Sequence, residues 1–152
     1  MTDALETGIT AEGFDAAQFM RYARRFGHGA ALGIDYVAHG DDWTELVLPY
    51  GQHLIADTGT GVIASGAIVS LMDMATSMAI WVKRDGFAPQ ATVDLRIDYL
   101  RPARPARSVI GRGECYRITR NLAFVRGVAH DGDPGDPLAH VAGSSISTGS
   151  WI

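Results

Sequence analysis

The stretch SGAIVSLMDMATSMAIWVK, from Ser65 to Lys83, decides the fold of this chain. Apolar side chains recur in it at intervals of three and four positions, which is the spacing of one face of an α-helix. These residues are Ile68, Leu71, Met72, Ala75, Ala79 and Val82. A carboxylate, Asp73, stands in the middle of the segment, and an ionised group in apolar surroundings is destabilising unless it is paired or hydrogen-bonded. Asp73 is therefore the first candidate for a functional residue.

Both ends of this helix carry recognisable signals. Ser65 is the predicted N-cap, and Arg84-Asp85-Gly86 with Pro89 ends the helix. The span from Gly61 to Val82 has Asp73 as its only charge and is long enough to cross a bilayer. An Asp at the centre of a membrane helix costs about 2.5–3.5 kcal/mol, and this span is rich in Gly, Ala, Ser and Thr. We therefore predict a helix buried in a protein core and no membrane partner.

Before this helix, the segment from Phe14 to Phe26 predicts a short N-terminal helix. Asp15 is placed as its N-cap, and Phe14 is placed to pack on Phe19 as a hydrophobic staple. We expect residues 1–13, ahead of it, to be a flexible N-terminus.

Most of the remaining chain alternates with the period of two that is typical of half-buried strands. Two strands are predicted within residues 31–49, around a Gly-Asp turn, followed by a glycine-rich loop at residues 50–64. Four consecutive strands are predicted after the long helix, the first of them ATVDLRIDYL. They occupy residues 91–100, 106–119, 121–130 and 137–147.

This order of elements predicts an α+β fold, in one domain over residues 1–152. A run of antiparallel strands with one hydrophobic helix must cover that helix, so we predict a curled antiparallel sheet wrapped around it. One sheet leaves a flank of the helix open. We therefore predict that a second copy of the chain covers this flank, in a homodimer or a homotetramer.

Composition excludes several classes of function. The net charge of −4 and the absence of a Lys/Arg run argue against nucleic acid as a partner. Cys115 is the only cysteine, which rules out an intrachain disulfide and a cysteine-rich zinc site and suits the cytoplasm. The five histidines show no metal-ligand spacing, and no dinucleotide, Walker or Gly-x-Ser-x-Gly motif is present. We predict no metal and no cofactor.

Two motifs together carry a resemblance to a known family. They are the Leu-x-Asp-x-Ala helix, here LMDMA, and the strand that runs from Thr-Val-Asp-Leu to Tyr-Leu-Arg-Pro-Ala. With the order of elements, they make residues 32–148 similar to the hotdog-fold acyl-CoA thioesterases of the PaaI-like type. The resemblance implies hydrolysis of an acyl-CoA to the free acid and coenzyme A.

The resemblance also implies roles for particular residues. Asp73 matches the family's general base or nucleophile, and Thr92 matches a hydroxyl residue that positions the attacking water across a subunit boundary. The family tends to have His-Gly-Gly before the helix and an Asn about six residues ahead of that His. This chain has Ala64-Ser65-Gly66 and Thr58 there. The backbone amides of Ser65 and Gly66 can still hold an oxyanion, because amides at a helix start point outward and the dipole reinforces them.

Substrate contacts are predicted at four positions. Thr58 and Ser77 offer hydroxyls near the helix, and Arg101 and Arg120 offer charge for the phosphates of coenzyme A. The altered triplet keeps a second interpretation open, namely a non-catalytic hotdog protein that binds acyl-CoA or another small ligand. A hydratase or dehydratase is disfavoured, because no His stands at the head of the helix to act as its base.

Overall fold

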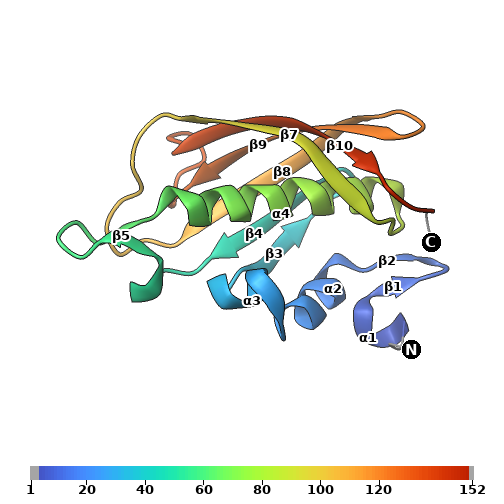
Figure 1. The fold of residues 1–152 in the computed structure, drawn as a ribbon, viewed down its shortest axis with the longest axis horizontal. Coiled ribbons are helices and arrows are strands. Elements are labelled where there is room, and N and C mark those ends of the chain that lie inside the picture. Colours follow the sequence, from blue (N-terminus) through green and yellow to red (C-terminus); the bar gives the residue numbers. More distant parts are fainter. Residues whose placement is uncertain (1–3, 151–152) are drawn as a thin grey trace.

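The computed structural model describes residues 4–150. One long helix, α4 (Ser65–Arg84), lies along a six-stranded antiparallel sheet that bends around it (Figure 1). The order of strands across the sheet is β3, β4, β8, β9, β10, β7. Their bounds are Asp35–His39, Trp43–Leu48, Val109–Ile118, Leu122–His130, Ala139–Ser147 and Gln90–Tyr99. The predicted α+β class, with its curled sheet around one central helix, is confirmed.

Glycines in the sheet let α4 approach its backbone closely. A Cβ atom on Gly113 of β8 would lie 2.6 Å from the backbone carbonyl of Ala75. On the neighbouring strand, Thr44 is fully buried and its Oγ1 donates to the carbonyl oxygen of Ala75 at 2.6 Å. A side chain at position 113 would therefore push α4 away from the sheet. The short distance between α4 and the sheet depends on this glycine.

The two faces of α4 differ in polarity. Leu71, Met72 and Ala75 are fully buried in the main core, as the helical stripe predicts. Asp73 and Ser77, which follow each other by one turn, are only half-buried. By length and composition α4 qualifies as a possible membrane span, but 56% of its apolar window is buried inside the protein. The prediction of a core helix agrees with this packing.

The N-terminal region confirms one prediction and corrects another. Asp15 caps α2 (Ala16–Ala23) by accepting from the Gln18 amide at 2.8 Å, and the Phe14 and Phe19 rings lie 5.5 Å apart. However, α2 ends at Ala23, and a separate helix, α3 (Gly27–Leu32), follows it. Gly27 and Gly33 both have positive φ, so they bracket an independent turn of helix where sequence alternation predicted the start of a strand.

Residues ahead of α2 have defined secondary structure. They form a short helix, α1 (Ala4–Thr7), and a small hairpin of β1 (Ile9–Thr10) and β2 (Gly13–Phe14). Ile9 packs against the main core. The expected flexible N-terminus therefore has structure from residue 4 onward. Its flexibility stays a prediction, and residues 1–3 lie outside the described part of the chain.

The glycine-rich segment before α4 also contains short elements. A 3₁₀ turn, η1 (Gln52–Leu54), leads into a hairpin of β5 (Ile55–Asp57) and β6 (Val62–Ile63). The N-cap of α4 is Ala64 and not Ser65, because Ala64 is the last extended residue and Ser65 already belongs to the helix. At the other end, Asp85 takes a left-handed conformation with φ of 48°, which confirms the predicted stop.

Strand β7 is the least covered strand of the sheet. It lies at one edge and pairs only with β10 among the strands described. Sequence alternation predicted that Val93 and Tyr99 face the core, but they are 59% and 46% exposed. Because β7 is an edge strand, its apolar side chains can be buried only by something outside this chain. This edge is the flank on which the predicted second copy would lie.

Candidate active site

Asp73 faces a cavity of ≈390 Å³ between α3, α4 and the start of β7. Apolar and polar side chains share its lining, with hydroxyl and amide groups around the carboxylate. The lining residues are His28, Gly29, Ile34, Ser70, Asp73, Met74, Ser77, Trp81, Gln90 and Thr92. The carboxylate in the middle of the apolar helix is therefore explained by an open, partly polar space in front of it.

Thr92 is the direct partner of the carboxylate. Its Oγ1 donates to Asp73 Oδ1 at 2.7 Å, and no other donor to this carboxylate is found in residues 4–150. The two residues belong to the same chain, so this contact corrects the expectation that Thr92 comes from a neighbouring subunit. A hydroxyl donor to one oxygen orients the carboxylate and leaves the other oxygen available to a substrate or a water.

Gln90 fixes the start of β7 against α4. Its Nε2 donates to the backbone oxygen of Ser77 at 3.0 Å, and both residues line the cavity. This bond lies two residues before Thr92, so it restrains the strand that carries the hydroxyl. Ser77 is thus in the cavity, as the sequence predicted.

His28 is a residue of this cavity that the sequence did not single out. It lies in α3, and its Nε2 is 2.9 Å from the Ser70 Oγ of α4. No local pattern marks this histidine, because the helix that carries it, α3, was itself not predicted. His28 is exposed, but its ring lines the same space as Asp73.

The helix start lies away from Asp73 within one chain. Ser65 and Gly66 are exposed and do not line the cavity. Eight residues separate Ser65 from Asp73, which corresponds to about 12 Å along a helix. The Tyr99 hydroxyl donates to the Ser65 carbonyl at 3.1 Å, and burial raises the pKa of Tyr99. One chain therefore does not bring the predicted oxyanion amides to the carboxylate.

Two other predicted contacts also lie outside the cavity. Thr58 is exposed in the turn between β5 and β6. Arg120 is exposed in the turn between β8 and β9, and within residues 4–150 its guanidinium has no hydrogen-bond or ion-pair partner. Neither residue lines the Asp73 cavity of its own chain.

The comparisons with known proteins agree with this geometry. A family model described as the thioesterase superfamily matches residues 60–138, about half of the chain, including α4 and β7. The chain belongs to the thioesterase superfamily. A protein from Pseudomonas aeruginosa of known structure is 39% identical, with a TM-score of 0.76, over 85% of this chain and 96% of its own. No curated protein matches the chain.

Two further structures show the fold of this superfamily. A thioesterase from Haemophilus influenzae is 18% identical, with a TM-score of 0.79, over 91% of this chain and 94% of its own. The PaaI protein from the E. coli phenylacetic acid degradation operon is 18% identical, with a TM-score of 0.70, over 82% of this chain and 86% of its own. The predicted likeness to PaaI-type hotdog thioesterases is thus confirmed at the level of the fold.

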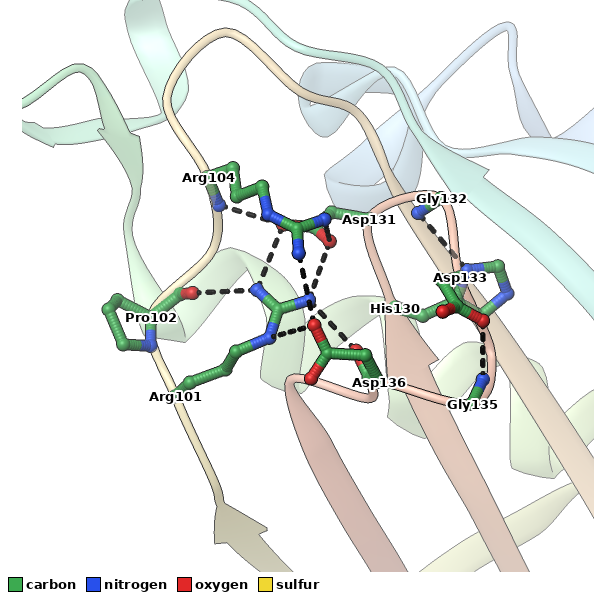
Figure 2. Close-up of polar contacts among 9 residues, drawn as sticks. All are labelled: Arg101, Pro102, Arg104, His130, Asp131, Gly132, Asp133, Gly135 and Asp136. Carbon is green, nitrogen blue, oxygen red and sulfur yellow. Dashed lines mark hydrogen bonds and ion pairs between the residues drawn. The ribbon is translucent and has the colours of Figure 1, made fainter.

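Arg101 has a structural role in this chain, contrary to the coenzyme A contact predicted for it. Its guanidinium makes two bonds to Asp131, with Nη2 to Oδ1 at 2.7 Å and Nη1 to Oδ2 at 3.1 Å (Figure 2). Its Nε lies 3.2 Å from Asp136 Oδ2. Arg104 contacts the same two carboxylates. We call these four residues the arginine–aspartate cluster.

The cluster joins the chain after β7 to the turn between β9 and β10. The side chain of Asp131 is fully buried, and the backbone amide of Arg104 also donates to it, at 2.8 Å. The Arg101 hydrogen bond is the main cause that lowers the pKa of Asp131 to about 2. The same pair raises the pKa of Arg101. With its donors directed at carboxylates, Arg101 is not free to bind phosphate.

Another cavity, of ≈230 Å³, lies over the central strands of the sheet, but it lacks a reactive arrangement. Its charged residues are already paired, Arg112 with Glu45 at 3.1 Å and Arg126 with Glu114 at 2.8 Å. Within residues 4–150, no group of three His, Cys, Asp or Glu side chains is placed to bind a metal ion. The Asp73 cavity, which lies within the matched residues and holds a carboxylate oriented by one hydroxyl, is the candidate active site.

Proposed function

We propose that this thioesterase hydrolyses an acyl-CoA thioester to the free acid and coenzyme A, with Asp73 as general base or nucleophile. One observation carries the proposal: an aspartate in the middle of the core helix faces a cavity and is held by a single hydroxyl donor. Thr92 occupies one oxygen of the carboxylate. The other oxygen can take a proton from water or attack the thioester carbon directly.

The carbonyl oxygen of the substrate needs hydrogen-bond donors, and the proposed ones, the amides of Ser65 and Gly66, do not line the cavity of their own chain. Amides at the start of α4 are suited to a developing oxyanion, because they point outward and the helix dipole adds to them. Ser65 and Gly66 are about 12 Å from Asp73 of their own chain, by the rise of a helix. We therefore propose that they serve the Asp73 cavity of a second copy whose α4 runs in the opposite direction.

The exposed edge of the sheet supports a homodimer, or a homotetramer built from two dimers. Val93 and Tyr99 on β7, with the adjoining Leu100, are between 46% and 59% exposed in one chain. A second copy placed against β7 would bury these apolar side chains. It would also lie close to the start of α4, to which Tyr99 is hydrogen-bonded. One contact surface would then complete both the sheet and the site.

Arg120 remains the proposed contact for the phosphates of coenzyme A. It is exposed and outside the cavity of its own chain, so this role also requires the cavity of another copy. Thr58 also stays a proposed substrate contact, in the cavity of another copy, because it lies outside the cavity of its own chain. A cytoplasmic location is part of the proposal as well, because the one cysteine, Cys115, is free and buried.

A second candidate function is binding of acyl-CoA or another small ligand without hydrolysis. The observation that favours it is the start of α4, where Ala64 makes no side-chain cap and no His or Asn is present to hold a carbonyl. Loss of one oxyanion donor costs about 10²- to 10³-fold in rate. Binding without turnover would follow if the amides of Ser65 and Gly66 do not compensate.

One experiment tests the proposal and separates the two functions. Purified protein is offered a panel of aromatic and aliphatic acyl-CoAs, and the free thiol released is measured for the native protein, Asp73→Asn and Asp41→Asn. Asp41 is an exposed carboxylate in the turn after β3 and serves as the matched control. We expect thiol release by the native protein and the control only. Equal release by Asp73→Asn would remove Asp73 from the mechanism, and binding of coenzyme A without release would favour the second function.

A further inference from the structure

His28 and Asp73 are the two titratable residues in the lining of the cavity. Helix α3, which carries His28, lies beside α4 (Figure 1) and packs its last residue, Leu32, against the main core. Ser70, the partner of His28, precedes Asp73 by three residues, and residues at this spacing are neighbours on one helix face. The imidazole is therefore held one helical turn from the carboxylate, on the same side of α4.

Hydrogen bonding at Ser70 fixes which ring nitrogen carries a proton. The Ser70 hydroxyl donates to the Gly66 carbonyl at 3.2 Å, which uses its single hydrogen. With its hydrogen directed at Gly66, the hydroxyl accepts from His28, and this assignment of the 2.9 Å contact has a hydrogen on Nε2. The second nitrogen, Nδ1, is not used by this bond. In the imidazolium form Nδ1 also carries a proton that can be given away.

We propose that His28 is the general acid of the reaction and protonates the departing thiolate; this rests on the proposed hydrolysis at Asp73. Asp73 takes a proton from water while the water oxygen bonds to the thioester carbon, and the carbonyl electron pair moves to oxygen. The carbonyl then re-forms, the carbon–sulfur bond breaks, and its electron pair leaves with sulfur. Sulfur takes the proton from Nδ1 of His28, and the proton held by Asp73 returns to His28 through solvent.

The imidazole of His28 supplies the cavity with a side chain of a kind that the start of α4 lacks. Ala64 provides no polar side chain where the related enzymes tend to have a histidine. In this chain an imidazole enters the cavity from α3 and is anchored on α4 through Ser70. The anchor holds Nε2, so Nδ1 is the nitrogen left for the substrate.

The dependence of rate on the leaving group tests this role. One acyl group is offered as its CoA thioester and as its 4-nitrothiophenyl thioester, whose electron-poor thiolate leaves without a proton. General acid catalysis contributes about 10²-fold or more, so we expect His28→Ala to lower kcat by about 10²-fold on the CoA thioester. On the nitrothiophenyl thioester we expect a change of less than about 3-fold, because no proton is needed there.

Controls separate this inference from its alternatives. His28→Gln keeps a polar side chain of similar length and should show the same selective loss, whereas His53→Ala, at an exposed histidine outside the cavity, should behave as the native protein. Equal loss on both thioesters, or no loss on either, would overturn the general-acid role of His28. If Asp73→Asn also retained full activity on both substrates, the proposed hydrolysis at Asp73 would fail instead.

Discussion

Two aspartates of this member of the thioesterase superfamily, Asp73 and Asp131, are each held by hydrogen-bond donors, but in opposite ways. Asp131 is fully buried and receives bonds from Arg101 and from the side chain and backbone of Arg104 (Figure 2). Asp73 is half-buried, receives one bond from Thr92, and faces a cavity. Both carboxylate oxygens of Asp131 accept hydrogen bonds, whereas only Oδ1 of Asp73 accepts one from the described residues, which leaves Oδ2 available to react.

The number and charge of the hydrogen-bond donors distinguish the structural carboxylate, Asp131, from the carboxylate proposed to react, Asp73. Two arginines hold Asp131 in its charged form and occupy its oxygens, so a substrate cannot bind there. The hydrogen bonds of Asp131 therefore contribute to the stability of the fold. A single neutral hydroxyl orients Asp73 without neutralising it. The sequence carried no signal for the role of Asp131, because its arginine partners lie 30 and 27 residues away along the chain.

The largest expected effect comes from Asp73→Asn. The substitution keeps the size of the side chain and removes its capacity to take a proton, so turnover of an acyl-CoA should fall by about 10²- to 10⁴-fold. The melting temperature should change by less than about 2 °C, because the side chain is only half-buried and lacks a charged partner. Thiol release and thermal unfolding measure the two quantities. A large fall in melting temperature would make Asp73 a structural residue like Asp131.

The opposite outcome is expected for Asp131→Asn. Removing this charge leaves Arg101 and Arg104 without their shared buried partner, and the melting temperature should fall by about 5–10 °C. Activity per folded molecule, measured well below the melting temperature, should stay within about 2-fold of the native value. Asp98→Asn is the matched control, because Asp98 is exposed and pairs with Arg96 on the surface. An equal effect of both variants on stability would contradict the role of the cluster.

A smaller effect is expected from the hydroxyl that orients Asp73. Thr92→Val removes the only donor described for that carboxylate, and a hydrogen bond to a charged group is worth about 1.5–3 kcal/mol, so kcat should fall about 10-fold or more. Thr92→Ser keeps the hydroxyl and should stay within about 3-fold. Steady-state kinetics on one acyl-CoA measures both. If valine and serine lowered kcat alike, the methyl group and not the hydroxyl would matter.

The smallest effect is the pH dependence of stability from Asp131. The pKa of Asp131 is lowered from 3.8 to about 2, mainly by the Arg101 hydrogen bond, so the unfolded chain binds this proton at a higher pH than the folded chain. The stabilisation is therefore complete above about pH 4 and is lost as the pH falls towards 2. Melting temperatures of the native protein and Asp131→Asn should converge over this window. A difference that stays constant down to about pH 2 would show that the charge of Asp131 is not what stabilises the fold.

Local patterns predicted most of the fold and part of the site. The long helix, the four strands after it and the cap at Asp15 follow from periodicity and capping, which act between residues close in the chain. Helix α3 was missed because two glycines with positive φ set it off as a separate turn, and because the alternation of Leu32, Ile34 and Tyr36 predicted a strand that overlaps its end. The N-cap of α4 was misplaced by one residue, since Ser65 is the more typical capping residue but Ala64 has the extended conformation.

By itself, the sequence determined the α+β class, the order of elements and the candidacy of Asp73, because each depends on residues that are neighbours along the chain or on motifs of the family. The tertiary structure decided the partners of each side chain. Thr92 meets Asp73 across 19 residues, Arg101 meets Asp131 across 30, and His28 meets Ser70 across 42. Such contacts depend on how helices and strands cross in space. The geometry of that crossing made Asp73 accessible and made Arg101 structural.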